Sequence, residues 1–109
     1  MNQSEPLTES YFYILLCLYR EPMHGYGIMQ ETLKLSDGRV KIGSGTMYGA
    51  TGNMMRKGWI EEIKATSIEE AKKRMYQLTL AGEEILQGEI VRLTELLDAV
   101  KIVKAATAK

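Results

Sequence analysis

Apolar residues recur with helical spacing in several stretches of the chain, and the first of these stretches is apolar on two sides. It covers residues 9–20, with Thr8 before it as a helix N-cap and Pro22 after it. Its two apolar stripes are Tyr11, Ile14, Leu15 and Leu18, and Phe12, Leu16 and Tyr19. A helix with two apolar sides must be buried on both. We therefore expect one side to face its own domain and the other a second surface, most simply a partner chain.

Two shorter helices are predicted next. Residues 23–27 are typical of a turn, and the apolar positions within residues 28–33 predict a short helix after it. Ser44 is the expected N-cap of a third helix, which continues to about residue 57 and is terminated by Gly58. Three helices therefore precede the first strand-like segment.

The last part of the chain predicts a hairpin and a long helix. Two short strand-like segments, residues 59–63 and 74–78, are joined by a polar loop and indicate a β-hairpin. Thr79 then caps a helix over residues 80–103. An a/d pattern typical of helix–helix interfaces runs along this helix through Leu86, Ile90, Leu93, Leu97 and Val100.

This order of elements is that of a winged helix-turn-helix. We therefore expect a mainly α fold with a two-stranded β-wing and a long C-terminal dimerisation helix. Residues 1–79 would form the winged-helix DNA-binding domain, and residues 80–109 the dimerisation helix, which belongs to one compact unit with the first.

Composition and length narrow the class of protein. The chain has 109 residues, of which 45% are hydrophobic and 26% charged, an ordinary globular composition. No apolar run approaches the ~20 residues of a membrane span, and the first residues lack the layout of a signal peptide. Cys17 is the only cysteine and His24 the only histidine, too few for a metal cluster or a nucleophile with its base. We expect a cytoplasmic protein without a metal, a cofactor or catalytic activity.

The net charge of zero hides an uneven distribution along the chain. Residues 1–33 contain one basic and four acidic residues, whereas residues 34–75 contain nine basic and five acidic residues. Residues 76–109 contain four basic and five acidic residues. The middle third therefore carries the positive field and is the part that suits phosphates, although charge alone does not decide between DNA and a randomly uneven surface.

The third helix has an inward and an outward face. The positions expected to pack inward are Met47, Ala50, Thr51 and Met54. The outward side offers Tyr48, Asn53, Arg56 and two glycines, of which Asn suits adenine and Arg suits guanine or a phosphate. Ser44 and the amide groups at the helix start suit a phosphate oxygen. The alternative is that this face is simply solvated.

Basic residues flank this helix on both sides. Lys41 lies just before it, and Lys72, Lys73 and Arg74 lie where the wing tip meets its second strand. These side chains would reach a minor groove or its phosphates, or belong to an ordinary solvated loop. The aromatic residues of the first helix, Tyr11 and Phe12 among them, would either pack in a dimer interface or line an effector cavity.

Four motifs together resemble the PadR family of bacterial transcriptional regulators. They are Gly25-Tyr26-Gly27-Ile28, Gly45-Thr46-Met47-Tyr48-Gly49-Ala50, Arg56-Lys57-Gly58-Trp59-Ile60-Glu61 and Arg74-Met75-Tyr76-Gln77-Leu78-Thr79-Leu80-Ala81-Gly82. The resemblance covers roughly residues 7 to 100, and its most specific part is the Gly-Thr-Met-Tyr entry to the third helix. The single short C-terminal helix is similar to the smaller branch of the family, some members of which respond to aromatic or drug-like ligands.

The resemblance implies a homodimer that binds a near-palindromic operator with the third helix in the major groove. It assigns DNA contacts to Thr46 and Tyr48, and also to Ser44 and Arg74. The chain departs from the family pattern beyond Ala50, where an Arg position holds Asn53 and a core Leu position holds Thr51.

Two functions remain in competition at this point. The first is a DNA-binding transcriptional regulator, a repressor that acts as a homodimer and is released by a small aromatic or drug-like effector. The second is a winged-helix module that contacts a protein and does not bind DNA.

Overall fold

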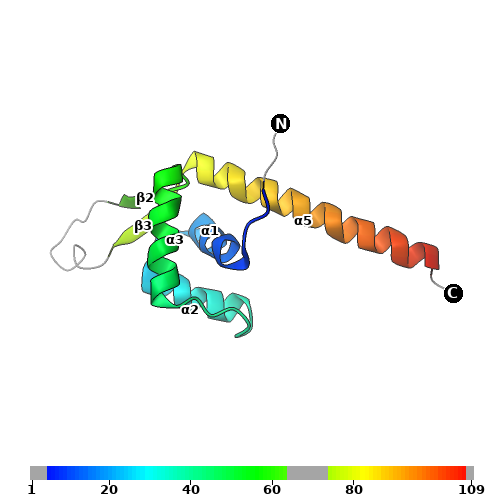
Figure 1. Ribbon diagram of the computed structural model, residues 1–109, viewed down its shortest axis with the longest axis horizontal. Coiled ribbons are helices and arrows are strands. Elements are labelled where there is room, and N and C mark those ends of the chain that lie inside the picture. Colours follow the sequence, from blue (N-terminus) through cyan, green and yellow to red (C-terminus); the bar gives the residue numbers. More distant parts are fainter. Residues whose placement is uncertain (1–4, 64–73, 108–109) are drawn as a thin grey trace.

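The computed structural model describes residues 5–63 and 74–107. The elements in this part of the chain are α1 (Glu9–Arg20), β1 (Met23–His24), α2 (Gly25–Leu35), α3 (Ser44–Lys57), β2 (Ile60–Ile63), β3 (Met75–Leu78) and α5 (Leu80–Thr107). Figure 1 shows α1, α2, α3 and the strands gathered into a body from which α5 extends. The predicted mainly helical fold, with three helices, a β-wing and a long last helix, is confirmed.

α1 is the central helix of the body. The hydroxyl of Thr8 accepts a hydrogen bond from the backbone N–H of Tyr11 at 3.2 Å, so Thr8 caps the helix as predicted. The buried side chains are Ile14, Leu15, Cys17 and Leu18. Phe12 and Leu16 on the second stripe are half-buried against the core, whereas Tyr19 is exposed. One stripe thus faces the protomer's own core, and the protomer covers the other only in part.

The predicted turn at residues 23–27 is wrong. Met23–His24 form β1, and α2 begins directly at Gly25. β1 pairs antiparallel with β3, so the sheet has three strands in the order β1-β3-β2 and not the two that the sequence predicted. A strand of two residues has no periodicity of its own, and only its pairing with a distant strand defines it.

The two longer strands follow the prediction closely. β2 and β3 pair antiparallel with Ile60 opposite Leu78 and Ile63 opposite Met75, and each begins one residue later than predicted. Ile60 and Tyr76 turn their side chains into the core, where both are buried. The predicted wing tip lies outside the described residues.

α3 ends at the glycine that the sequence predicted. Gly58 has a left-handed backbone conformation (φ 78°), which suits a residue without a Cβ. Its N–H donates to the carbonyl of Met55 at 3.1 Å, and the N–H of Trp59 donates to that of Met54 at 2.9 Å. These two bonds satisfy two of the last four carbonyls of α3, where the chain reverses into β2.

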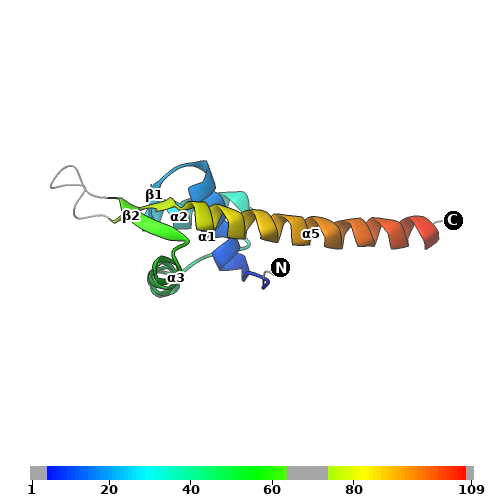
Figure 2. The same cartoon turned by 90° about the horizontal axis from the view of Figure 1, so that it is seen from above.

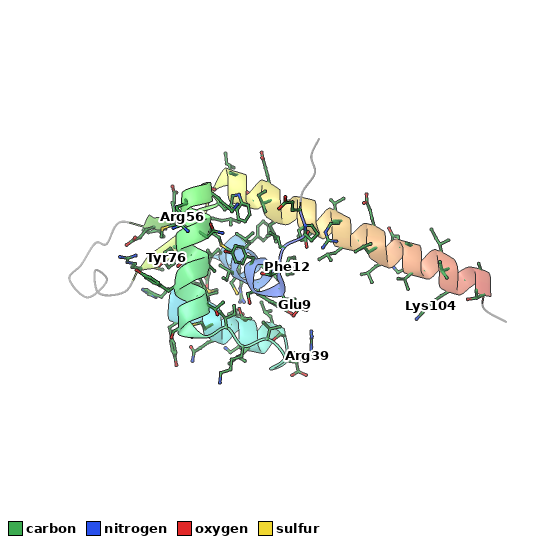
Figure 3. All side chains as sticks on the ribbon, in the orientation of Figure 1. Glu9, Phe12, Arg39, Arg56, Tyr76 and Lys104 are labelled. Carbon is green, nitrogen blue, oxygen red and sulfur yellow. The ribbon has the colours of Figure 1, made fainter. Side chains whose placement is uncertain are left out.

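α5 leaves the body after its first few turns. Thr79 caps the start of α5, since its hydroxyl accepts a hydrogen bond from the N–H of Gly82 at 3.0 Å. The helix continues past its predicted end, Val103, to Thr107. Figures 2 and 3 show its C-terminal half projecting alone, with side chains directed into open space. The molecule measures 63 Å along its longest axis and 34 and 21 Å along the other two, and α5 accounts for most of the longest dimension. Among the described helices none is both long and apolar enough to cross a membrane.

Candidate nucleic-acid interface

α3 turns one face to the core and the other to solvent. Its buried residues are the predicted ones, Met47, Ala50, Thr51 and Met54. The Thr51 hydroxyl donates to the carbonyl of Met47 at 3.0 Å, so this buried polar atom is satisfied within the helix. On the outward face Tyr48 is 72% exposed, and Arg56 is exposed as well. The unusual Thr51 thus occupies a core position without an unpaired group.

The first turn of α3 is open to solvent. Its cap is Gly43, in an extended conformation (φ −75°, ψ 162°), and not the predicted Ser44, which is the first helical residue. No side chain of the described part of the protein caps this end, and Ser44, Gly45 and Thr46 are all exposed. The positive end of the helix dipole and its first amide groups therefore face outward, which suits a phosphate oxygen.

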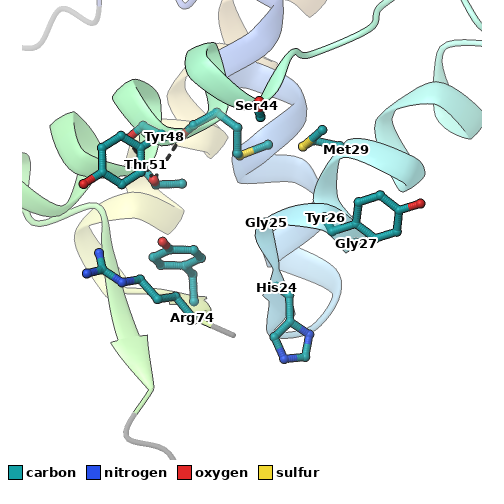
Figure 4. A pocket seen from close by; sticks show the side chains of 11 residues that line it. His24, Gly25, Tyr26, Gly27, Met29, Ser44, Tyr48, Thr51 and Arg74 are labelled. Atoms are coloured by element: carbon teal, nitrogen blue, oxygen red, sulfur yellow. Dashed lines mark hydrogen bonds between the residues drawn. The ribbon is translucent and has the colours of Figure 1, made fainter. Parts of the chain in front are cut away.

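A hollow of about 600 Å³ lies between α2, α3 and the start of β3 (Figure 4). Figure 4 shows Tyr48 and Arg74 on one side of it and Tyr26 on the other. Ser44 also contributes to its lining, and the buried Met47 forms part of its wall. The hollow therefore has a largely apolar wall with hydroxyl and guanidinium groups around it.

A smaller hollow of about 210 Å³ adjoins the first along α3. Tyr48 and Arg74 line both, and Arg56 lines the smaller one beside Gly52. Ser44, Tyr48 and Arg56 all lie on α3, and the fold brings Arg74, just before β3, onto the same exposed surface. We call these four residues the reading surface.

The other predicted DNA contacts lie elsewhere. Thr46 is exposed in the first turn of α3, and Lys41 is exposed in the segment before it, but neither lines the two hollows. Lys72 and Lys73 lie outside the described residues. Their predicted contacts with DNA stay predictions.

Asn53 faces the body of the protein. Its side-chain nitrogen donates to the hydroxyl of Tyr11 on α1 at 2.8 Å. This bond uses one of the two N–H groups of the amide, and the predicted contact of Asn53 with adenine stays a prediction. Asn53 therefore ties α3 to α1 in this structure and is not part of the reading surface.

Tyr26 is a surface residue that the sequence interpretation missed. It is 68% exposed in the first turn of α2 and lines the larger hollow opposite Tyr48. Its hydroxyl accepts a hydrogen bond from the side-chain nitrogen of Gln30 at 3.2 Å. Because residues 23–27 have the composition of a turn, their sequence does not indicate that Tyr26 is an exposed residue at a helix start.

One of the predicted dimer contacts is wrong. Leu86 is fully buried within its own protomer (0% exposed), so it has no surface left for a partner. Ile90, Tyr11 and Phe12 are half-buried against the same core, and Leu93 is half-buried. The a/d pattern is continuous in sequence, but its first residue serves the protomer's own core.

Beyond Leu93 the apolar residues of α5 are uncovered. Four of them lie within about one third of the circumference of the helix. They are Leu96, Leu97, Val100 and Val103, whose exposed fractions are 53%, 61%, 47% and 61%. We call these four residues the distal band. Leu97 and Val100 were predicted from the a/d pattern, whereas Leu96 and Val103 were not.

A buried carboxylate marks the point where α5 still belongs to the body. The side chain of Glu89 is 3% exposed and accepts two hydrogen bonds from Arg92, at 2.8 and 2.7 Å. It also accepts the backbone N–H of Leu7 at 3.2 Å. The Arg92 guanidinium, helped by the Leu7 N–H, lowers the pKa of Glu89 against the opposing effect of its burial. Glu89 thus fastens the segment before α1 to α5.

A further cavity, of about 540 Å³, lies between that segment, α1 and the end of α3. Two aromatic residues, Tyr11 and Trp59, line it together with Lys57. The Lys57 ammonium lies 5.3 Å from the centre of the Trp59 ring, a cation–π distance. Of the helix-one aromatics considered for an effector cavity, Tyr11 lines this one.

The described residues contain no cluster of three or more His, Cys, Asp or Glu side chains with the geometry to hold a metal ion. Cys17 is buried, and burial raises the pKa of its thiol. A buried thiol with a raised pKa is a poor nucleophile, so Cys17 behaves as a core residue.

The sequence model of the transcriptional regulator PadR-like family matches residues 14–88. The chain belongs to this family, and the resemblance inferred from the sequence motifs is confirmed. PadR-like proteins are DNA-binding transcription regulators and not enzymes, which confirms the expectation that the chain is not catalytic. Comparison with curated proteins gives no match.

Solved structures with the same fold include three bacterial regulators. A PadR-like transcription factor from Bacteroides fragilis is 25% identical, with a TM-score of 0.71 over 85% of this chain and 87% of that one. A PadR family transcription regulator from Clostridium difficile R20291 is 21% identical, with a TM-score of 0.66 over 94% of this chain and 100% of that one. A transcriptional regulator from Clostridium thermocellum is 23% identical, with a TM-score of 0.65 over 91% and 92% of the two chains.

Proposed function

We propose that this PadR-like protein is a homodimeric repressor that binds a near-palindromic operator with α3 in the major groove. The observation that carries the proposal is the reading surface. Ser44, Tyr48, Arg56 and Arg74 are exposed together next to the uncapped start of α3. Guanidinium groups and helix amides are the groups that proteins use to hold phosphates and read guanine. We expect such a protein in the cytoplasm, where the DNA is.

The distal band supports the proposed homodimer. Four large apolar side chains on one side of a projecting helix favour burial against a second copy, each by ~1.5–3 kcal/mol. Two copies joined through α5 place two reading surfaces on one duplex, which calls for a two-fold related operator.

Salt dependence tests the DNA proposal. Binding to a random duplex should weaken steeply with salt, by a slope of about −0.9 for each phosphate contacted, when log affinity is plotted against log salt. Arg56→Gln together with Arg74→Gln should flatten the slope by about 4 in the dimer if both guanidiniums contact phosphates. Arg20→Gln is the matched control, because Arg20 pairs with Glu31 away from the reading surface. A flat salt response of the natural protein would favour the protein-interaction module instead.

Release by a small aromatic effector is supported by the cavity lined by Tyr11 and Trp59. Trp59 is the only tryptophan of the chain, so its fluorescence reports occupancy of this cavity. We expect planar aromatic compounds that release DNA to quench it saturably. Release of DNA without quenching would place the effector site elsewhere.

A further inference from the structure

The C-terminal end of α3 packs directly against the start of α5, although β2 and β3 lie between the two helices in the sequence. The two residues after α3, Gly58 and Trp59, lie against the residues that open α5, Thr79 and Gly82. Figure 1 shows this end of α3 beside the first turn of α5. We call these four residues the junction.

Thr79 holds both sides of the junction. Its hydroxyl donates to the carbonyl of Gly58 at 2.6 Å and accepts the N–H of Gly82 at 3.0 Å. Its backbone N–H donates to the carbonyl of Trp59 at 3.0 Å. One residue therefore binds both residues that follow α3 and caps the N-terminal end of α5 at once.

Gly82 allows the two backbones to touch. A Cβ at this position would lie 2.0 Å from the carbonyl oxygen of Trp59 and 2.9 Å from its carbonyl carbon. These are backbone atoms, which cannot swing aside as the end of a side chain can. Any residue other than glycine at position 82 must therefore push the start of α5 away from Trp59.

We propose that Thr79 and Gly82 are specificity-determining residues, because they fix the angle between α3 and α5 and so determine the half-site spacing that the dimer selects. This proposal rests on the proposed function as a DNA-binding dimer. Residues 82–97 of α5 span about 22 Å, so a rotation of about 10° at the junction moves α3 by about 4 Å relative to the distal band. That exceeds one base-pair step of about 3.4 Å, and the dimer contains the junction twice.

The test uses the full-length dimer and an operator selected from a random duplex pool. Duplexes carry the two half-sites at the selected spacing or with one or two base pairs inserted or removed. The natural protein should prefer one spacing at least tenfold, and Gly82→Ala should reduce this preference below threefold or move it. Affinity of Gly82→Ala for a duplex with a single half-site should stay within twofold. Glu84→Ala, an exposed change one turn into α5, should keep the natural preference.

Two variants of Thr79 test the same proposal without adding a Cβ, as Gly82→Ala does. Thr79→Val removes the hydroxyl and should weaken the spacing preference, whereas Thr79→Ser retains the hydroxyl and should keep the natural preference. A purely stabilising role of Thr79 would lower affinity for all spacings alike. An unchanged preference in Thr79→Val overturns the proposal, even if Gly82→Ala does not fold.

A measurement without DNA separates this proposal from the proposed function. A spin label at Gly49→Cys, an exposed site on α3 where a Cβ would have no other side chain within 4 Å, reports the distance between the two α3 helices of the dimer. Cys17 is buried and should not take up the label. Gly82→Ala should shift or broaden the distance distribution by several ångströms. An unchanged distribution contradicts the proposal, whether or not the natural protein binds the duplexes.

Discussion

α3 and α5 each leave one face uncovered by the protomer, but the two faces differ in chemistry. α3 exposes Tyr48 and Arg56 beside glycines, whereas α5 exposes the distal band of leucines and valines. Water solvates a polar face at little cost, so the exposure of the reading surface is stable without a ligand. An apolar band on a projecting helix has no such compensation and favours association. Under the proposed function, α5 takes the lasting partner, a second copy of the chain, and α3 takes the exchangeable one, the operator DNA.

The largest effect is expected from a charge in the distal band. Leu97→Asp removes about 2 kcal/mol of apolar burial from each subunit, so the dimer dissociation constant should rise by about a thousandfold. Sedimentation equilibrium measures it. Ile102→Asp makes the matched change on the opposite side of α5, where Ile102 is exposed, and should leave the dimer intact. A Leu97→Asp protein that is as dimeric as the control would move the interface away from the distal band.

Much of the fold follows from local patterns in the sequence. The Thr8 cap, the inward face of α3 and the Gly58 terminator each depend on residues within one or two turns of a helix. β1 does not, because its two residues are defined only by pairing with β3. α5 is also defined in part by contacts with distant residues. Its a/d spacing is the same in the part of the helix that packs on α1 and in the part that projects into solvent. The pattern therefore could not separate Leu86, a core residue, from Leu97.

The candidate site was predictable to a similar degree. Tyr48 and Arg56 follow from the helical wheel of α3, since their direction depends only on helix geometry. The place of Asn53 does not, because its partner, Tyr11, lies on another helix. The burial of Glu89 was also hidden, since an acid in an amphipathic helix is usually solvated and only the approach of Leu7 and Arg92 explains its position.

A second prediction concerns the boundary between the packed and the projecting part of α5. The pKa of Glu89 is lowered in the folded protein, so its ionised form stabilises the fold. This stabilisation is complete above the pKa of a glutamate in the unfolded chain, about 4.3, and is lost as the pH falls through the lower folded value. Glu89→Gln should lower the free energy of unfolding by about 2 kcal/mol at pH 7, measured by urea denaturation.

The difference between Glu89→Gln and the natural protein should shrink as the pH approaches 3. Glu95→Gln is the control, because Glu95 is exposed on the projecting part of α5. A constant difference between pH 7 and pH 3 would show that ionisation of Glu89 does not stabilise the fold.

A third prediction tests the exposed face of α3. Tyr48→Ala should weaken operator binding by about tenfold, the loss of about 1.4 kcal/mol expected for one or two contacts, and leave the dimer intact. Fluorescence anisotropy with labelled operator measures the affinity. Tyr19→Ala removes an equally large exposed side chain from α1, outside the two hollows of the reading surface, and should bind normally. Normal binding by Tyr48→Ala would exclude Tyr48 as a contact.

The smallest effect concerns Asn53, which lies on the flank between the two faces of α3. Its hydrogen bond to Tyr11 should contribute about 1 kcal/mol to the stability of the protein, so Asn53→Ala and Tyr11→Phe should each cost about that much. The double variant should cost little more than either single one, since both remove the same bond. Operator affinity should stay within twofold in all three variants, because the Asn53 amide is bound to Tyr11 of α1. A loss of adenine preference in Asn53→Ala, with stability unchanged, would instead assign Asn53 to the reading surface.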